Sequence, residues 1–325
     1  MFSISGSKIW VAGYRGMVGS ALVRRLDREQ CEIVTASRAE LDLTCQAEVE
    51  AWLSAARPDL IFLAAARVGG IHANAAYPAE FIYQNLAIQT NVIEAAHRCG
   101  VRKLVFFGSS CTYPKFAPQP VAEEQLLAGP PEATNVWYAV AKMAGLKMVE
   151  AYRQQYGCDF INLMPANTYG PCDNFDPQAS HVIPAMIRKF HAAREEGRDQ
   201  VELWGTGTPL REFLFVDDLA DAAIFLAEQY ASGDLVNIGT GEEVAIGTLA
   251  EQVAEVTGFQ GRLVFNTNKP DGAPRKLLDS TRLRRLGWRP KTSLAEGLVA
   301  TYEWFKQHQG NIPNGSGEIA NYVPK

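Results

Sequence analysis

The sequence predicts an α/β protein built on a doubly wound, mainly parallel sheet. Short and almost continuously apolar runs alternate with amphipathic stretches through the first half of the chain. A glycine-rich turn, from Gly13 to Gly19, follows the first apolar run directly. Strands of a parallel sheet are buried on both faces and are therefore apolar throughout, so this pattern favours a parallel sheet with helices on each side.

The apolar runs are expected to be the strands of this sheet. They span residues 8–12, 32–35, 60–64, 103–107 and 159–163. A further strand is expected over residues 235–238, where the chain returns to the sheet after an irregular stretch. Runs of this length, separated by helical patterns, are typical of repeated β-α-β units.

Helices are expected over residues 138–156, 182–194 and 216–228. The last of these opens with Val216-Asp217-Asp218-Leu219, which indicates a helix start capped by an aspartate side chain. Asp is among the residues preferred at an N-cap, because its carboxylate accepts a hydrogen bond from a free backbone N–H of the first turn.

Composition excludes several classes of function. The chain has 325 residues, of which 47% are hydrophobic, and a net charge of -5, with no basic run interleaved with aromatics. Nucleic-acid binding is therefore not expected. No window approaches the roughly 18 apolar residues of a membrane span, and the first residues do not resemble a secretion signal, so we expect a cytoplasmic protein. The six cysteines show no metal-binding spacing, which favours reduced thiols and no metal site.

The glycine-rich turn predicts a dinucleotide site. Gly13, Gly16 and Gly19 lie between a strand and an amphipathic helix, where glycines permit a tight turn and a close approach of the backbone to a pyrophosphate. The second strand is followed by Arg38, without the acidic residue that would bind a free ribose 2'-hydroxyl. Together with Arg15, it indicates a clamp for a 2'-phosphate, so NADP is expected over NAD.

A tyrosine-lysine pair predicts acid-base chemistry. Tyr138 and Lys142 are four residues apart on a predicted helix and share one face. The ammonium is expected to lower the pKa of the phenol, which makes it a proton donor or acceptor. Ser109, at the end of the strand over residues 103–107, can donate a hydrogen bond to the same substrate oxygen, and Cys111 lies two residues later.

Taken together, these motifs resemble the extended short-chain dehydrogenase/reductases. Longer segments resemble one family of nucleotide-sugar enzymes within them, the GDP-L-fucose synthases. These segments are residues 13–20, 68–71, 81–85, 108–111, 180–184, 204–213 and 269–276. The resemblance extends over residues 8–308, with Tyr14 at a position where the family has His.

That family epimerises C3 and C5 of GDP-4-keto-6-deoxy-mannose and then reduces C4 with NADPH. The resemblance implies Cys111 as the base and His181 as the group that returns the proton on the opposite face. Both hydrogens are α to a ketone, so the Ser109 and Tyr138 hydroxyls would stabilise the enolate oxygen. Tyr138 would then protonate the C4 oxygen, and Lys142 would hold the nicotinamide ribose. Which of Cys111 and His181 takes the proton at each centre stays open.

The resemblance also implies the binding residues. The cofactor site would comprise Gly13, Tyr14, Arg15, Gly16, Met17, Val18, Gly19, Arg38, Asp42, Leu43, Ala64, Ala65, Phe107, Gly108, Ser109, Ser110, Tyr138, Lys142, Pro165, Ala166, Asn167, Thr168 and His181. The GDP-sugar would contact Lys189, Trp204, Arg211 and Asp271. We expect a homodimer, because relatives pair through two helices, with residues 81–98 and 138–156 as candidates.

The resulting domain organisation is interleaved. We expect an NADP-binding Rossmann domain over residues 1–170, to which segments near 212–240 return. A smaller and mainly substrate-binding domain is expected over residues 171–310. The last residues, 311–325, are rich in Gly, Pro, Asn and Ser without periodicity, and we expect them to form a mobile tail.

Other functions remain alternatives at this point. A sugar-nucleotide 4,6-dehydratase would share the cofactor turn and the Tyr-Lys pair, but it has Thr-Asp-Glu where this chain has Ser109-Ser110-Cys111. A 4-epimerase would hold NAD and need no proton pair of Cys and His. A third possibility is a scaffold that binds dinucleotides without catalysis.

Overall fold

A six-stranded parallel sheet is the largest element of the computed structural model, which describes residues 2–177, 179–269 and 271–311. Across the sheet the order is β10 (Val236–Ile238), β5 (Phe160–Pro165), β4 (Lys103–Phe107), β3 (Leu60–Leu63), β1 (Lys8–Ala12) and β2 (Glu32–Val34). Each neighbouring pair is parallel. The predicted doubly wound α/β fold is confirmed, and the six strand boundaries differ from the prediction by at most two residues.

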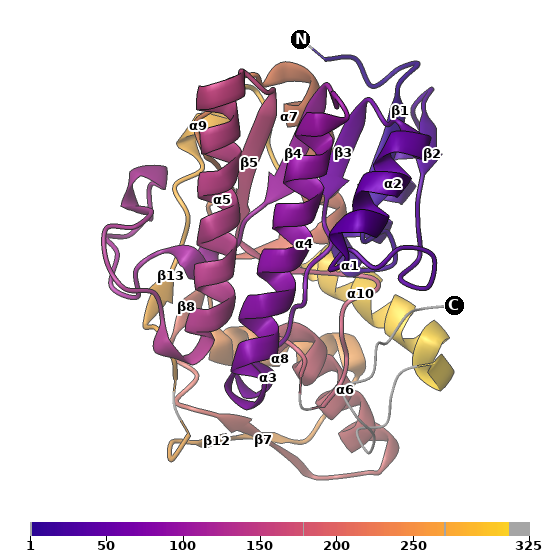
Figure 1. The fold of residues 1–325 in the computed structure, drawn as a ribbon. Coiled ribbons are helices and arrows are strands. Elements are labelled where there is room, and N and C mark those ends of the chain that lie inside the picture. The colour runs from indigo at the N-terminus through magenta and orange to yellow at the C-terminus, as the bar shows by residue number, and fades with distance from the viewer. Residues whose placement is uncertain (1, 178, 270, 312–325) are drawn as a thin grey trace.

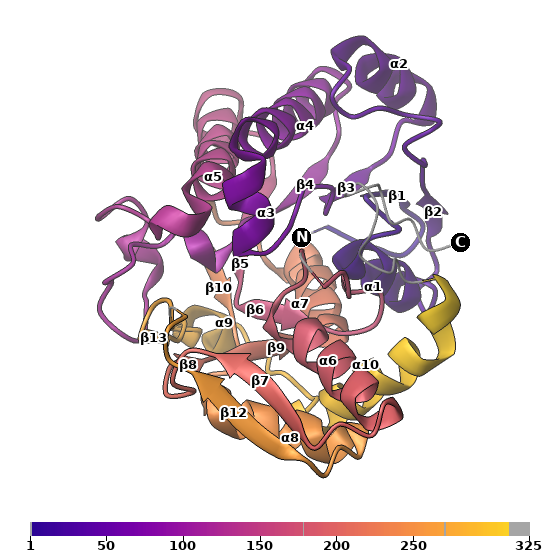
Figure 2. The ribbon, with the colours of Figure 1, turned by 90° about the horizontal axis from the view of Figure 1, so that it is seen from below.

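Helices cover both faces of this sheet (Figures 1 and 2). One face carries α2 (Gln46–Ala56), α4 (Pro78–Arg98) and α5 (Val136–Tyr156), and the other carries α1 (Met17–Leu26) and α7 (Val216–Gln229). All residues of β3 are fully buried as a result. Burial on both faces explains why the strands are apolar without alternation.

The remainder of the chain packs at one end of the sheet around a second apolar core (Figure 1). This part contains α6 (Val182–Glu195), β7 (Gln200–Trp204), α8 (Ile246–Thr257), β12 (Arg262–Asn266) and α10 (Leu294–His308). Its core includes Ile187, Phe190, Val253 and Leu298, each at most 1% exposed. The division at residue 170 stays a prediction, and the predicted tail beyond residue 311 lies outside the described residues.

Short elements connect the two parts. β6 (Asn167–Tyr169) pairs with β9 (Phe213–Phe215), and β8 (Leu210–Arg211) lies between β11 (Val244–Ala245) and β13 (Arg275–Lys276). The remaining helices are α3 (Ile71–Ala76) and α9 (Thr281–Arg285). Single 3₁₀ turns are η1 (Ser110–Thr112), η2 (Glu123–Gln125), η3 (Ala133–Asn135) and η4 (Gln309–Asn311).

The helix starts include one difference from the prediction. Helix α7 begins after Phe215, and no side chain caps it. Asp218 instead accepts hydrogen bonds from the backbone N–H groups of Lys291 and Thr292, at 3.2 and 2.9 Å. The predicted aspartate cap is therefore wrong, because tertiary contacts with the segment before α10 use that carboxylate.

Within the described ranges, none of the helices has both the length and the apolar character that crossing a bilayer requires. In the same ranges, no group of three or more His, Cys, Asp or Glu side chains is arranged to hold a metal ion.

Candidate active site

The glycine turn after β1 has a different requirement at each glycine. Gly13 has a φ of +87°, and a Cβ there would lie 2.7 Å from the backbone of Ala65. A Cβ on Gly19 would lie 2.1 Å from the carbonyl oxygen of Gly13. At Gly16 the closest heavy atom would be 3.5 Å away, an ordinary contact. The protein's own packing thus requires Gly13 and Gly19, whereas Gly16 leaves the start of α1 open to a ligand.

The start of α1 is therefore suited to the pyrophosphate of a dinucleotide. Its N-cap is Gly16, which has no side chain, so no side chain caps the N–H groups of the first turn. Met17 and Val18 form the first turn, whose N–H groups attract an anion together with the helix dipole. These residues fit the group that the sequence predicts at this turn.

Arg15 and Arg38 both lie near the loop that follows β2. The Nε of Arg15 donates to the hydroxyl of Tyr14 at 2.8 Å, and its charge acts on Glu40. The charge of Arg38 acts on Asp42, whose pKa is lowered mainly by hydrogen bonds from Thr44. The charges of Arg15, in the glycine turn, and of Arg38 thus act on one loop at the edge of the sheet.

Most other predicted cofactor residues lie at the carboxyl ends of the central strands. Phe107, Gly108 and Ser110 end β4 or follow it, Ala64 and Ala65 follow β3, and Pro165, Ala166, Asn167 and Thr168 end β5 or follow it. Asp42 and Leu43 lie in the loop after β2. Ligands of open α/β sheets bind at this edge, so the structure brings the predicted set to the expected place.

Ser109 and Cys111 are joined directly at the end of β4. Ser109 is the N-cap of η1, and the Sγ of Cys111 donates a hydrogen bond to the Oγ of Ser109 at 3.0 Å. The Ser109 hydroxyl also interacts with the phenol of Tyr138 on α5. One hydroxyl therefore bridges the thiol and the phenol that the sequence predicts to be reactive.

Lys142 lies one turn after Tyr138 but does not act on its phenol. The Nζ of Lys142 donates to the carbonyl oxygen of Phe107 at 2.8 Å, and burial lowers its pKa to about 8. Burial raises the pKa of Tyr138, and the Ser109 hydrogen bond opposes this. The expected lowering of the phenol pKa by Lys142 is not found, because the ammonium faces the strand end. A phenol that keeps its proton is suited to donate it.

His181 lies at the N-cap of α6, next to a segment that packs beside Tyr138. Ala179 belongs to a small buried cluster with Ala73 and Phe81, and Tyr138 packs against this cluster. Burial lowers the pKa of His181, and the charge of Lys276 lowers it further. His181 as a whole is nevertheless solvent-exposed, and it belongs to a segment of the chain distant in sequence from Ser109.

The predicted substrate residues fall into two groups. Arg211 donates to the carbonyl oxygen of Asp271 at 3.5 Å, while the Asp271 carboxylate accepts from the backbone N–H and the hydroxyl of Thr206, at 2.7 and 2.9 Å. The Nζ of Lys189 donates to the Glu202 carbonyl oxygen at 2.8 Å.

Trp204, two residues after Glu202 on the same strand, is 60% exposed and has the Lys269 ammonium 5.1 Å from its ring centre. Among the described residues, no hydrogen bond or ion pair joins Trp204 or Lys189 to Ser109, Cys111 or Tyr138.

Two residues of this region were missed by the sequence analysis. Lys276 exerts its charge on both Cys111 and His181. Glu212 is fully buried and accepts hydrogen bonds from the backbone N–H groups of Gly241 and Leu278 at 2.7 and 2.9 Å. Both lie inside segments that resemble the family, residues 204–213 and 269–276, and this was the signal that could have identified them.

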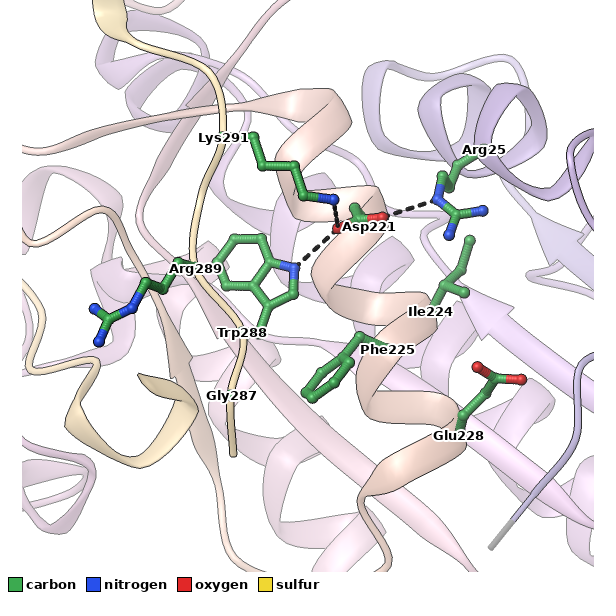
Figure 3. A pocket seen from close by; sticks show the side chains of 9 residues that line it. All are labelled: Arg25, Asp221, Ile224, Phe225, Glu228, Gly287, Trp288, Arg289 and Lys291. Carbon is green, nitrogen blue, oxygen red and sulfur yellow. Dashed lines mark hydrogen bonds and ion pairs between the residues drawn. The ribbon is translucent and has the colours of Figure 1, made fainter. Parts of the chain in front are cut away.

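A surface pocket elsewhere has no part in this site. It measures about 320 Å³ and lies between α1, α7 and residues 287–291 (Figure 3). Asp221 holds Arg25, Lys291 and the indole nitrogen of Trp288 together there, at 2.9, 3.1 and 3.0 Å. None of Ser109, Cys111 and Tyr138 lines this pocket. Its charged side chains instead join α1, α7 and residues 287–291 to one another.

Comparison with known proteins assigns the family. The model of the NAD dependent epimerase/dehydratase family matches residues 9–239. The chain belongs to this family. It is 58% identical over 305 residues to the probable GDP-L-fucose synthase 1 of Oryza sativa, with 93% of each chain covered. The resemblance predicted from the sequence motifs is therefore confirmed.

Solved structures agree with this assignment. The GDP-L-fucose synthetase of Naegleria fowleri, solved with NADP bound, superposes with a TM-score of 0.88 at 26% identity, covering 96% of this chain and 98% of that one. A GDP-6-OMe-4-keto-L-xylo-heptose reductase from C. jejuni superposes with a TM-score of 0.87 at 38% identity, covering 93% and 98%.

Proposed function

We propose that this protein is an NADPH-dependent epimerase and reductase that converts GDP-4-keto-6-deoxy-mannose into GDP-L-fucose. The observation that carries the proposal is the hydrogen bond between Cys111 and Ser109 beside Tyr138. His181, at the start of α6, is under the charge of the same lysine, Lys276, as Cys111. A thiol and an imidazole form a proton-exchanging pair, and a phenol and a hydroxyl can bind a carbonyl oxygen. Identity of 58% to a probable GDP-L-fucose synthase supports the same substrate.

The first reaction exchanges protons at C3 and C5. Cys111 removes the proton α to the C4 ketone, and His181 returns one to the opposite face. Ser109 and Tyr138 donate hydrogen bonds to the C4 oxygen, where the negative charge of the enolate collects. The second reaction reduces C4, for which bound NADPH supplies the hydride. Tyr138 then gives its phenolic proton to the C4 oxygen, and Lys142 holds the cofactor ribose.

NADP(H) is the proposed cofactor. Gly16 and the first turn of α1 would bind the pyrophosphate, because this turn is open to a ligand. Arg15 from the glycine turn and Arg38 from the loop after β2, whose charges both act on that loop, would bind the 2'-phosphate. The NADP-bound relative from Naegleria fowleri supports this choice.

The GDP part of the substrate would bind on the surface of the part of the molecule that is built around the second apolar core. Trp204 offers an exposed indole plane for the guanine, and Lys189 and Arg211 offer cations for the phosphates. Asp271 would act indirectly here. Its carboxylate accepts hydrogen bonds from Thr206, and it would position that loop rather than contact the substrate itself.

We further propose a cytoplasmic homodimer. Helices α4 and α5 lie side by side on the outside of the sheet (Figure 1), and they expose Tyr83, Trp137 and Val140 by 66%, 45% and 39%. Large apolar side chains gathered on two neighbouring helices are typical of an interface. The six cysteines are all unpaired, which suits a reducing compartment.

The deciding experiment uses GDP-4-keto-6-deoxy-mannose and NADPH in deuterated water. We expect NADPH oxidation together with deuterium at C3 and C5 of the product. Absence of both would overturn the proposal. Oxidation without deuterium would instead identify a simple C4 reductase, the activity named for the C. jejuni heptose reductase.

A further inference from the structure

Backbone pairing fixes Lys276 between two segments, the strand that carries Arg211 and the loop that follows Cys111. Strand β13 lies beside β8 and pairs with it in parallel (Figure 2). This register sets Lys276 opposite Arg211. The next residues pair with another segment, because the backbone N–H of Val121 donates to the Leu277 carbonyl at 2.8 Å and Asp279 donates back to Val121 at 2.9 Å. Val121 belongs to the loop that leaves η1, so this pairing ties Lys276 to the segment that follows Cys111.

A buried carboxylate fixes this arrangement further. Glu212, fully buried, accepts the backbone N–H of Leu278 at 2.9 Å and donates its own N–H to the Lys276 carbonyl at 3.3 Å. The same carboxylate binds the backbone N–H of Gly241 at 2.7 Å. The backbone around Lys276 is therefore fixed by hydrogen bonds to Glu212 and to Val121.

Within the described part of the chain, the Lys276 ammonium has no hydrogen-bond acceptor and no ion-pair partner. Its neighbour Arg275 differs, because it forms an ion pair with Glu243 at 2.8 Å. The groups that exchange electrostatic effects with Lys276 are Cys111, His181, Arg211 and Glu132. A partly buried cation without an ion pair, whose charge acts on a thiol and an imidazole, points to an anion that forms during the reaction.

We propose that Lys276 is a positioning residue of this site, whose ammonium stabilises the Cys111 thiolate and so supplies the base for epimerisation. The proposal rests on the function proposed above. It gives the two proton-exchanging groups opposite tasks. A positive charge favours the thiolate, and it also makes a protonated His181 a stronger acid. Cys111 would therefore take the proton, and His181 would return it.

The electrostatics of the thiol support this role. Burial raises the pKa of Cys111, and the Lys276 charge is the largest influence in the opposite direction. The Ser109 hydrogen bond and the Lys142 charge act in the same direction but more weakly. Tyr138 also faces the thiol from α5 and carries no charge while it is protonated. Lys276 is therefore the group whose removal should alter the thiol most.

The test measures the thiol itself, without substrate. Full-length protein carrying bound NADP would be alkylated with iodoacetamide across a pH series, and the Cys111 peptide would be followed by mass spectrometry. Lys276→Met should move the midpoint of alkylation upward and slow the reaction at pH 7 about tenfold, the effect of one unit in the thiol pKa. Lys276→Arg should restore most of the rate, and Arg275→Met, on the same strand, should leave the profile unchanged.

A second measurement separates the possible outcomes. Deuterium incorporation at C3 and C5 in Lys276→Met should show the same upward shift in its pH profile. An unchanged alkylation profile in a folded Lys276→Met protein would overturn the proposal. If only the KM for the GDP-sugar rises, Lys276 is a ligand of the substrate phosphates and the proposal is also overturned. A parent protein that neither oxidises NADPH nor incorporates deuterium would refute the proposed function, while the thiol measurement would still be readable.

Discussion

The Sγ of Cys111 lies 3.0 Å from the Oγ of Ser109 and donates its hydrogen to it. Both residues belong to one turn at the end of β4, and Ser109 also interacts with Tyr138 on α5. The group proposed for proton exchange and the group proposed for C4 reduction therefore share one hydroxyl. A single bound sugar can meet both, which allows two reactions in one site.

Cys111→Ser should stop epimerisation without removing cofactor binding. A serine hydroxyl is a much weaker acid than a thiol and cannot provide the base, so deuterium incorporation at C3 and C5 should fall by ~10²–10⁴-fold. The measurement is mass spectrometry of the nucleotide sugar after incubation in deuterated water. Cys99→Ser is the matched control, since its thiol lies 3.6 Å from the Ser54 hydroxyl and takes no part in the proposed site. Full incorporation by Cys111→Ser would show that another group is the base.

Tyr138→Phe should separate the two reactions differently. Loss of the phenolic proton should lower the rate of NADPH oxidation by ~10²–10⁴-fold, because the C4 oxygen loses its acid. Deuterium exchange should fall less, since Ser109 still stabilises the enolate. Stopped-flow absorbance of NADPH and mass spectrometry would give the two rates. Equal losses in both would mean that Tyr138 serves the enolate as much as the reduction.

Gly19→Ala should lower the stability of the fold, whereas Gly16→Ala should lower the affinity for NADPH. A methyl group at Gly19 would lie 2.1 Å from the Gly13 carbonyl oxygen, so this variant should lose ~1–3 kcal/mol or more of stability. At Gly16 the nearest protein atom would be 3.5 Å away, so the variant should fold normally but bind NADPH weakly. Thermal unfolding and fluorescence titration with NADPH would distinguish them. Normal NADPH affinity in Gly16→Ala would place the pyrophosphate elsewhere.

Arg38→Ala should change the choice of cofactor. If Arg38 binds the 2'-phosphate, the variant loses a charge-assisted contact worth about 1.5–3 kcal/mol, and the affinity for NADPH should fall ~10–100-fold. The affinity for NADH should change little. Arg28→Ala, an exposed arginine after α1, serves as the control. Equal changes for both cofactors would contradict a role in phosphate binding.

Asp173 should make the stability of the fold depend on pH. It is 4% exposed, one oxygen has no hydrogen-bond partner, and burial raises its pKa to about 7. Because the folded-state pKa lies above that of the unfolded chain, stability is greatest below about pH 4 for this group and falls as pH rises through 7.

Asp173→Asn should remove this dependence. The variant should be as stable as the parent near pH 4 and more stable at pH 8, by at most about 4 kcal/mol. Denaturant unfolding at both pH values is the measurement. Asp199→Asn is the control, because that side chain is 87% exposed. A parent and variant with parallel pH profiles would show that Asp173 is not buried in its charged form.

The fold was largely readable from the sequence. Burial on both faces makes every central strand apolar, so the strands, the helices between them and the parallel sheet follow from local pattern. Their boundaries agree with the structure within two residues. The aspartate cap of α7 was predicted wrongly, because the carboxylate of Asp218 serves a segment more than seventy residues later, between α9 and α10. Local sequence contains no signal for such a contact.

The site divides in the same way. The sequence by itself determined the glycine turn, Ser109 with Cys111, and the Tyr138-Lys142 pair, because each set lies within one short segment and one element positions it. Only the tertiary structure decided that Lys142 faces the Phe107 carbonyl rather than the phenol, and that Lys276 reaches Cys111. The sequence determines which residues carry a charge, but packing between distant segments determines the groups on which each charge acts.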